Sequence, residues 1–280
     1  MAVVSFWGNN RRETGQTLSV VALGTVMAIE HNYKILVIST GFRDTTMEES
    51  FWEKSKSNMA TSLRGATPTS FNNGFEGLVK VIQSNRTSSN IIKDYAKVVF
   101  RDNRLDILLS PNTNDPRVYN SLTQYYKDII KFADKEYDLV LVDVDKRMSG
   151  QDKSAILQES NLIVFTLKQN QEAIEVAKTI KENTIQSGKN NIAFLIGKYD
   201  MYSKYNTKNI TRFLKENREV SAVPYNTLYN EASTEGKVAD VILNFRNITD
   251  TSDNNMKFLQ ETKRSCENII YKLQELQMRM

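Results

Sequence analysis

The fold of this chain is decided by residues 3–18, which read Val3-Val4-Ser5-Phe6-Trp7-Gly8-Asn9-Asn10-Arg11-Arg12-Glu13-Thr14-Gly15-Gln16-Thr17-Leu18. The stretch begins as a short apolar run suited to a buried strand and then passes through a polar loop. It continues into an apolar, helix-compatible run that ends at Ile29. A strand, a loop and a helix in this order form the frame in which a phosphate group rests on a helix N-terminus.

The polar loop matches the phosphate-binding pattern G-x-x-x-x-G-K-[ST] only in part. Gly15 and Thr17 stand where the second glycine and the hydroxyl residue belong, but Gln16 takes the place of the lysine. Gly15 would let backbone N–H groups approach a phosphate, and the Thr17 hydroxyl would contact Mg²⁺. The alternative is a polar turn in which Thr17 caps the helix.

Strands and helices alternate along the rest of the chain. Short apolar runs predict strands at 34–40, 105–109, 137–143, 162–166, 192–196 and 220–223. Helical spacing predicts helices at 18–31, 47–52, 75–82, 115–132, 153–159, 173–180, 209–215, 228–242 and 255–278. Residues 57–73 resemble a loop, and 91–100 are ambiguous. The alternation predicts an α/β fold, a mostly parallel sheet with helices on both faces, in a single domain spanning 1–280.

The composition is ordinary for a globular protein, with 40% hydrophobic and 25% charged residues. Cys266 lies among helical apolar positions and is predicted to be a core residue, and with His31 it leaves no His/Cys metal cluster. No window approaches the roughly eighteen apolar residues of a spanning helix. The net charge of +4, spread over scattered Lys and Arg, does not favour nucleic acid. We therefore expect a cytoplasmic protein.

Polar residues follow two further predicted strands. In an open parallel sheet, ligands collect beyond the carboxyl ends of the strands. Asp143 follows four apolar residues and would hold a Mg²⁺ water shell, unless it ends the strand in a polar turn, a role that Asp145 would serve equally. Lys198, after Gly197, would lie along a purine, and a generic turn is the alternative.

Together these segments resemble the MinD/ParA superfamily of deviant Walker A ATPases, and within it the TadZ/CpaE-like proteins of Flp (Tad) pilus assembly. The resemblance is carried by residues 6–17, 33–37, 137–143 at the Walker B position, 223–226 and 231–240. It implies a P-loop NTPase fold and a sandwich homodimer that closes on two ATP–Mg²⁺ molecules.

The resemblance also implies roles for individual residues. Arg11 aligns with the lysine that reaches across the dimer, Thr17 and Asp143 would hold Mg²⁺ through the nucleotide, and Pro224 and Tyr225 would border the base. The implied nucleotide-binding residues are Gly8, Arg11, Arg12, Thr14, Gly15, Gln16, Thr17, Leu18, Asp143, Lys198, Pro224 and Tyr225.

The chain departs from the family pattern at several of these positions. Gln16 removes a positive charge from the place where negative charge develops. Ser39 stands where the family has its water-orienting Asp, and Gly197 where an Asn reads adenine. Arg12 and Glu13 replace glycines and crowd the backbone approach. We predict weak or absent ATPase activity and assign no catalytic residue.

The resemblance implies a localisation or scaffold protein for a membrane-associated machine, such as a Flp/Tad pilus or a secretion system, with protein components of that machine as partners. The alternatives are a DNA-partitioning ParA-like ATPase and a nucleotide-independent pseudo-ATPase interaction module. Arg11 and Arg12 would then form a surface anion site or a protein interface. The helix at 254–280 would contact the inner face of the membrane, as basic amphipathic C-terminal helices of MinD relatives do, or pack onto the sheet.

Overall fold

The computed structural model of the chain describes residues 1–8, 14–53, 74–84, 90–102, 104–188 and 190–278. In these residues, eight strands form one sheet in the order β3-β4-β2-β5-β1-β6-β7-β8. The strands are β1 (Ala2–Trp7), β2 (Ile35–Ser39), β3 (Lys97–Phe100), β4 (Leu105–Leu108), β5 (Leu139–Asp143), β6 (Leu162–Leu167), β7 (Ile192–Tyr199) and β8 (Ser221–Pro224). Every neighbouring pair is parallel except β3 and β4, which confirms the predicted mostly parallel sheet.

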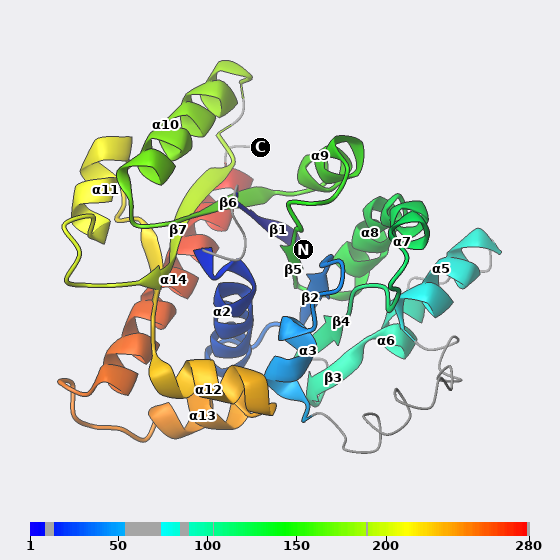
Figure 1. Cartoon of the computed structure of the whole chain (residues 1–280), viewed down its shortest axis with the longest axis horizontal. Coiled ribbons are helices and arrows are strands. Elements are labelled where there is room, and N and C mark those ends of the chain that lie inside the picture. Colours follow the sequence, from blue (N-terminus) through cyan, green and yellow to red (C-terminus); the bar gives the residue numbers. More distant parts are fainter. Residues whose placement is uncertain (9–13, 54–73, 85–89, 103, 189, 279–280) are drawn as a thin grey trace.

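Helices cover both faces of this sheet (Figure 1). They are α2 (Gln16–Glu30), α3 (Thr46–Phe51), α5 (Phe75–Gln83), α6 (Ile91–Tyr95), α7 (Pro116–Thr123), α8 (Tyr126–Glu136), α9 (Gly150–Gln158), α10 (Gln171–Gln186), α11 (Thr207–Leu214), α12 (Thr227–Glu235), α13 (Val238–Phe245) and α14 (Asn254–Gln277). Successive strand residues face opposite sides, so Val4 packs with α2 and α14 while Val3 packs with α5 and α8. Helices α10 and α11 cover β6, β7 and β8 on the second face.

The helix predicted at 115–132 is two helices, α7 and α8. Asp115 caps α7 by accepting a hydrogen bond from Arg117 N, with Pro116 in the first turn, as the Asp-Pro sequence indicates. The chain bends before Tyr126, because the buried ring of Tyr126 packs against Phe75 with ring centroids 4.6 Å apart. The Tyr126 hydroxyl also donates to the Ser39 carbonyl at 3.1 Å, which fixes the start of α8 under β2.

The helix predicted at 228–242 is also divided, into α12 and α13. Gly236 ends α12 in the left-handed conformation, with φ of 75°. A Cβ at this position would lie 2.5 Å from the Glu53 backbone nitrogen, so the close approach of the chain after α3 requires glycine here. In the ambiguous region 91–100, the structure forms α6 and the edge strand β3.

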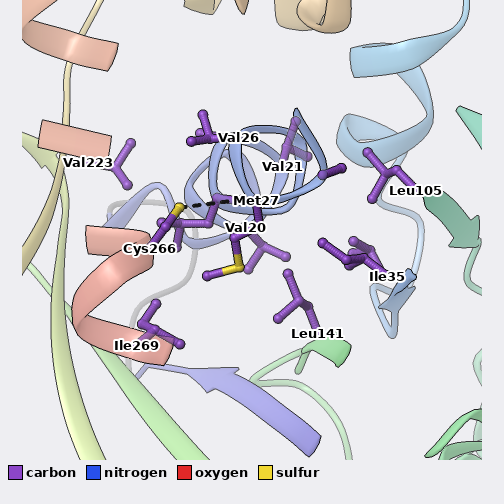
Figure 2. Close-up of a cluster of buried hydrophobic side chains, with 14 of the residues drawn as sticks. Val20, Val21, Val26, Met27, Ile35, Leu105, Leu141, Val223, Cys266 and Ile269 are labelled. Atoms are coloured by element: carbon purple, nitrogen blue, oxygen red, sulfur yellow. Dashed lines mark hydrogen bonds between the residues drawn. The ribbon is translucent and has the colours of Figure 1, made fainter. Parts of the chain in front are cut away.

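Helix α14 packs onto the sheet and α2. Its buried residues Phe258, Leu259, Cys266, Ile269 and Leu273 belong to the same core as α2. Figure 2 shows Cys266 and Ile269 beside the α2 residues Val20 and Met27. The Cys266 thiol lies 3.6 Å from the Leu23 carbonyl of α2, and burial raises the pKa of this thiol well above its usual range. The prediction that Cys266 is a core residue is confirmed.

The apolar stripe of α14 is therefore used within the fold, and the prediction that this helix contacts a membrane gains no support from it. None of the described helices is both long and apolar enough to cross a bilayer.

Candidate functional site

The candidate site lies where the carboxyl ends of the central strands β2, β5 and β1 meet the N-terminus of α2. Asp143, the last residue of β5, pairs in register with Phe6 of β1 and Ser39 of β2. Because all three strands are parallel, the loops after them open at the same edge of the sheet, where ligands of open α/β sheets collect.

Gly15 precedes the first turn of α2 in the left-handed conformation, with φ of 66°. Its carbonyl accepts the Ser19 backbone N–H at 2.9 Å and so begins the helix. A Cβ on Gly15 would lie 2.8 Å from Lys198 Cγ, because the Lys198 stem packs across this residue. Glycine is required here for both its φ and the close approach of Lys198.

Gln16 is fully buried, and its amide group joins three elements. Its Nε2 donates to Asp143 Oδ1 at 2.7 Å, to the Phe6 carbonyl at 3.1 Å and to the Val144 carbonyl at 3.0 Å. An amide nitrogen has two N–H groups, so all of its donor capacity is used within the protein. The side chain at the lysine position is thus an internal tie between α2, β1 and β5.

The Thr17 hydroxyl completes this network by donating to Asp143 Oδ2 at 2.8 Å. Asp143 is fully buried, and each of its carboxylate oxygens accepts a hydrogen bond from the first turn of α2. The structure therefore brings together Gln16, Thr17 and Asp143, which the sequence placed in one site. Thr17 and Asp143 offer the oxygen ligands that Mg²⁺ prefers, so these two residues fit the implied metal.

Gln16 Oε1 is a buried acceptor with no hydrogen-bond partner among the described residues. It lies 3.4 Å from the place that a Cβ on Gly8 would take. Gly8 itself approaches the β6 backbone, since such a Cβ would lie 2.5 Å from the Thr166 carbonyl oxygen. An unpaired carbonyl oxygen attracts a donor and repels an anion, so Gln16 does not fit a phosphate as the family lysine would.

Asp145, the alternative to Asp143, has a structural role. The fully buried carboxylate accepts the Arg147 guanidinium at 2.7 Å and the Phe42 backbone N–H at 3.0 Å. Its backbone N–H donates to Thr40 Oγ1 at 2.7 Å, which ties the loops after β2 and β5. Thr40 and Arg147 were not anticipated as parts of this edge, and the Asp-x-Arg spacing after the strand was the available signal.

Ser39, which we expect at the position of the family Asp, is buried at the end of β2. Its hydroxyl lies 3.5 Å from the Gly41 backbone nitrogen, and its carbonyl accepts the Tyr126 hydroxyl. In the place of a carboxylate, the site therefore has an uncharged hydroxyl beside the backbone.

The residues expected at the base surround a small cavity beside the N-terminus of α2. Lys198, Pro224 and Tyr225 line it with Gly15 and Ser19, and its volume is about 20 Å³. A space of this size holds about one water molecule. Gly197 cannot carry an Asn, because a Cβ there would lie 2.0 Å from the Thr14 carbonyl oxygen.

Four further residues were predicted to bind the nucleotide, and the structure describes two of them. Thr14 is buried at the start of the first turn, and Leu18 packs against the core that contains α2. Arg11 and Arg12, predicted to contact phosphate, lie outside the described residues. In the described part of the chain, no group of three or more His, Cys, Asp or Glu side chains could hold a metal ion.

The chain was compared with known proteins. No family model and no curated protein matches it. A ParA family ATPase from Chlorobium tepidum TLS is 15% identical over 85% of this chain and 90% of that chain, with a TM-score of 0.61. The cell division ATPase MinD of Pyrococcus furiosus is 13% identical over 96% and 100%, with a TM-score of 0.62. A putative plasmid partition protein from Borrelia burgdorferi B31, bound to AMPPNP, is 15% identical over 97% and 98%, with a TM-score of 0.60.

These likenesses extend over nearly the whole sheet and its helices, and at this level of identity they establish the fold. The chain has the α/β fold of the MinD and ParA ATPases, a P-loop NTPase fold.

Proposed function

We propose that this chain is a MinD/ParA-like localisation or scaffold protein for a membrane-associated machine, such as a Flp/Tad pilus or a secretion system, and that it acts without turning over ATP. The absence of ATP turnover is supported by the Gln16 amide, which is buried and hydrogen-bonded to Asp143, Phe6 and Val144. The scaffold role rests on the resemblance to TadZ/CpaE-like proteins together with the fold.

The network around Gln16 argues against phosphoryl transfer. Catalysis of this reaction depends on fixed positive charge near the oxygens on which negative charge develops. Gln16 supplies no charge, its N–H groups are used within the protein, and its oxygen is a buried acceptor. Ser39 likewise gives no carboxylate to orient an attacking water.

A weak nucleotide site is compatible with this proposal. The Thr17 hydroxyl donates to Asp143 at 2.8 Å, which supports our proposal that these two residues would hold Mg²⁺ with a nucleotide. Such binding would favour a homodimer and so act as an assembly signal. A solved MinC:MinD complex from Aquifex aeolicus has this fold and contains a partner protein. A chain that does not hydrolyse ATP would still have the surfaces through which a scaffold binds its partners.

The test measures phosphate release and calorimetric binding of Mg-ATP by the purified chain. We expect no phosphate release above that of the Asp143→Asn variant, because the site lacks the lysine. The Gln16→Lys variant restores the ammonium, and we expect it to bind Mg-ATP at least about tenfold more tightly than the wild type. Phosphate release by the wild type that is absent from Asp143→Asn would contradict the proposal that the chain does not turn over ATP. Circular dichroism of each variant checks that it is folded.

A further inference from the structure

A groove lies between α10 and α11, whose ribbons run side by side at the upper left of Figure 1. Its volume is about 330 Å³, and it is lined largely by the side chains of Ile174, Tyr205, Ile210 and Phe213. None of the residues that line this groove belongs to the candidate nucleotide site. The groove is therefore a separate feature of the surface.

The groove has an apolar floor and an exposed aromatic wall. Ile174 of α10 and Ile210 of α11 are almost completely buried and form part of the core beneath. Phe213 of α11 is 46% exposed, although it lies beside that floor. A concave apolar surface with an exposed ring beside it is typical of a place that receives an apolar side chain.

Helix α11 and the residues next to it are strongly basic, and Lys204 of this segment lines the groove. Residues 201–215 contain Lys204, Lys208, Arg212 and Lys215 and no Asp or Glu, a local charge equal to the +4 of the whole chain. In the part of the chain that the structure describes, none of these four side chains has a carboxylate within ion-pairing distance. Their charges are therefore available to another molecule.

Cations also lie directly over the aromatic rings of the groove. Lys204 Nζ is 5.0 Å from the centre of the Tyr205 ring, and Lys178 Nζ is 5.7 Å from that of Phe213. Such pairs keep ammonium groups next to apolar surface. The acidic side chains nearby already have partners within the protein. On α10, Glu175 accepts a hydrogen bond from Gln171 and Glu182 lies 3.9 Å from Lys178, and beside α11 Glu216 and Glu219 pair with Lys181 and Arg264.

We propose that this groove binds an acidic peptide segment of a partner protein, with a large apolar side chain of the peptide inserted between Ile174, Ile210 and Phe213. Carboxylates of the peptide then lie along α11, near Lys204, Lys208 and Arg212. The volume suits one or two anchoring side chains, and the charges steer the segment and set its orientation. A nucleic acid would use the cations, but its phosphates would leave the apolar floor unfilled. The proposal is independent of whether the chain binds nucleotide.

The test is a selection of short random peptides displayed on phage against the full-length chain. We expect the enriched peptides to be acidic and to carry a Leu, Phe or Trp. Fluorescence polarisation of a labelled enriched peptide then gives the affinity. We expect Phe213→Ser and the double variant Lys208→Glu/Arg212→Glu each to weaken binding at least about tenfold. The double variant should also abolish the salt dependence of binding.

Matched variants control for general effects on the surface. Val118→Ser replaces an apolar side chain of α7 that is 44% exposed, and Lys80→Glu/Arg101→Glu reverses two exposed charges elsewhere. Both should leave peptide binding unchanged. Enriched peptides without acidic character, or peptides that bind Phe213→Ser as well as wild type, would overturn the proposal. So would a failure to enrich any peptide. Double-stranded DNA binding that is lost in Lys208→Glu/Arg212→Glu but kept in Phe213→Ser would reassign the surface to nucleic acid.

Discussion

At the scale of single residues, Gln16 matters more for the fold than the sequence pattern suggested. A glutamine in place of the lysine predicted a lost charge, and the structure shows in addition three hydrogen bonds to Asp143, Phe6 and Val144. These bonds could not be predicted from the loop alone. They depend on the pairing of β1 with β5, which places Phe6 opposite Asp143.

We expect Gln16→Leu to lower the free energy of unfolding by about 3 kcal/mol, because it removes the hydrogen bonds that the Gln16 amide donates to the buried Asp143 carboxylate and to the Phe6 and Val144 carbonyls. Chemical denaturation with a two-state fit measures the change. Gln158→Leu, at an exposed position at the end of α9, serves as the control and should change the stability by less than about 0.5 kcal/mol. Equal stability of Gln16→Leu and wild type would show that the amide does not tie the strands.

A second buried carboxyl gives a prediction about pH. Asp106 of β4 is buried and accepts the Tyr137 hydroxyl at 2.7 Å. Burial raises the pKa of Asp106 above its ordinary 3.8, although the hydrogen bond from Tyr137 and the charge of Lys93 oppose this. The folded state thus holds the proton more firmly than the unfolded state does. The stability that this carboxyl contributes is present below 3.8 and is lost as the pH rises through the folded-state pKa.

The variant Asp106→Asn keeps an acceptor for Tyr137 and removes the titration. We expect the wild type to lose stability relative to Asp106→Asn as the pH rises from 3.8, with a constant difference above the folded-state pKa. Denaturation curves over this range measure the difference. Parallel pH profiles for the two proteins would contradict the assignment, and Asp94→Asn, at α6, provides a control carboxyl that is not fully buried.

At the scale of elements, the contact between β7 and the start of α2 holds the candidate site together. Gly197 allows it, because the Thr14 carbonyl oxygen stands 2.0 Å from where a Cβ would be. We expect Gly197→Ala to cost about 3 kcal/mol of stability, since the backbone must shift to relieve this overlap. Gly150→Ala, at the start of α9 with nothing within 4 Å of a Cβ, should be neutral or stabilising. Thermal unfolding compares the two variants directly. Equal unfolding midpoints would show that the backbone near Gly197 shifts at no cost in stability.

The elements themselves were predictable where one pattern dominated. The continuous apolar runs of β2, β5 and β6 predicted strands covered on both faces, and the structure confirms them. Strand β3 could not be recognised, because it is short and lies at the exposed edge of the sheet, where no alternation is enforced. The break at Gly236 was missed since helical spacing continues across it, and only the packing on Glu53 shows why the helix ends.

At the scale of the whole molecule, the alternation of strands and helices was sufficient to predict the sheet and its two helical layers, and the structure confirms both. The candidate site was predictable as a set of positions, because the carboxyl ends of parallel strands meet at one edge. Its chemistry was not, since the orientation of the Gln16 amide and the placement of the Lys198 stem are set by contacts between distant segments. The groove between α10 and α11 was not predicted from the sequence either, because the basic residues look scattered along the chain.

The packing of α14 on α2 has a consequence for how the protein is made. The Cys266 thiol lies 3.6 Å from the Leu23 carbonyl, so α2, the first of the described helices, packs against a residue 243 positions further along the chain. During translation, the part of α2 that packs against α14 stays uncovered until residues 254–277 have left the ribosome. Domains that close with such late contacts leave hydrophobic surface open to chaperones for most of their synthesis. A ribosome that stalls before α14 would therefore release a chain in which part of α2 is still exposed. We expect such a chain to be prone to aggregation and to be bound by chaperones.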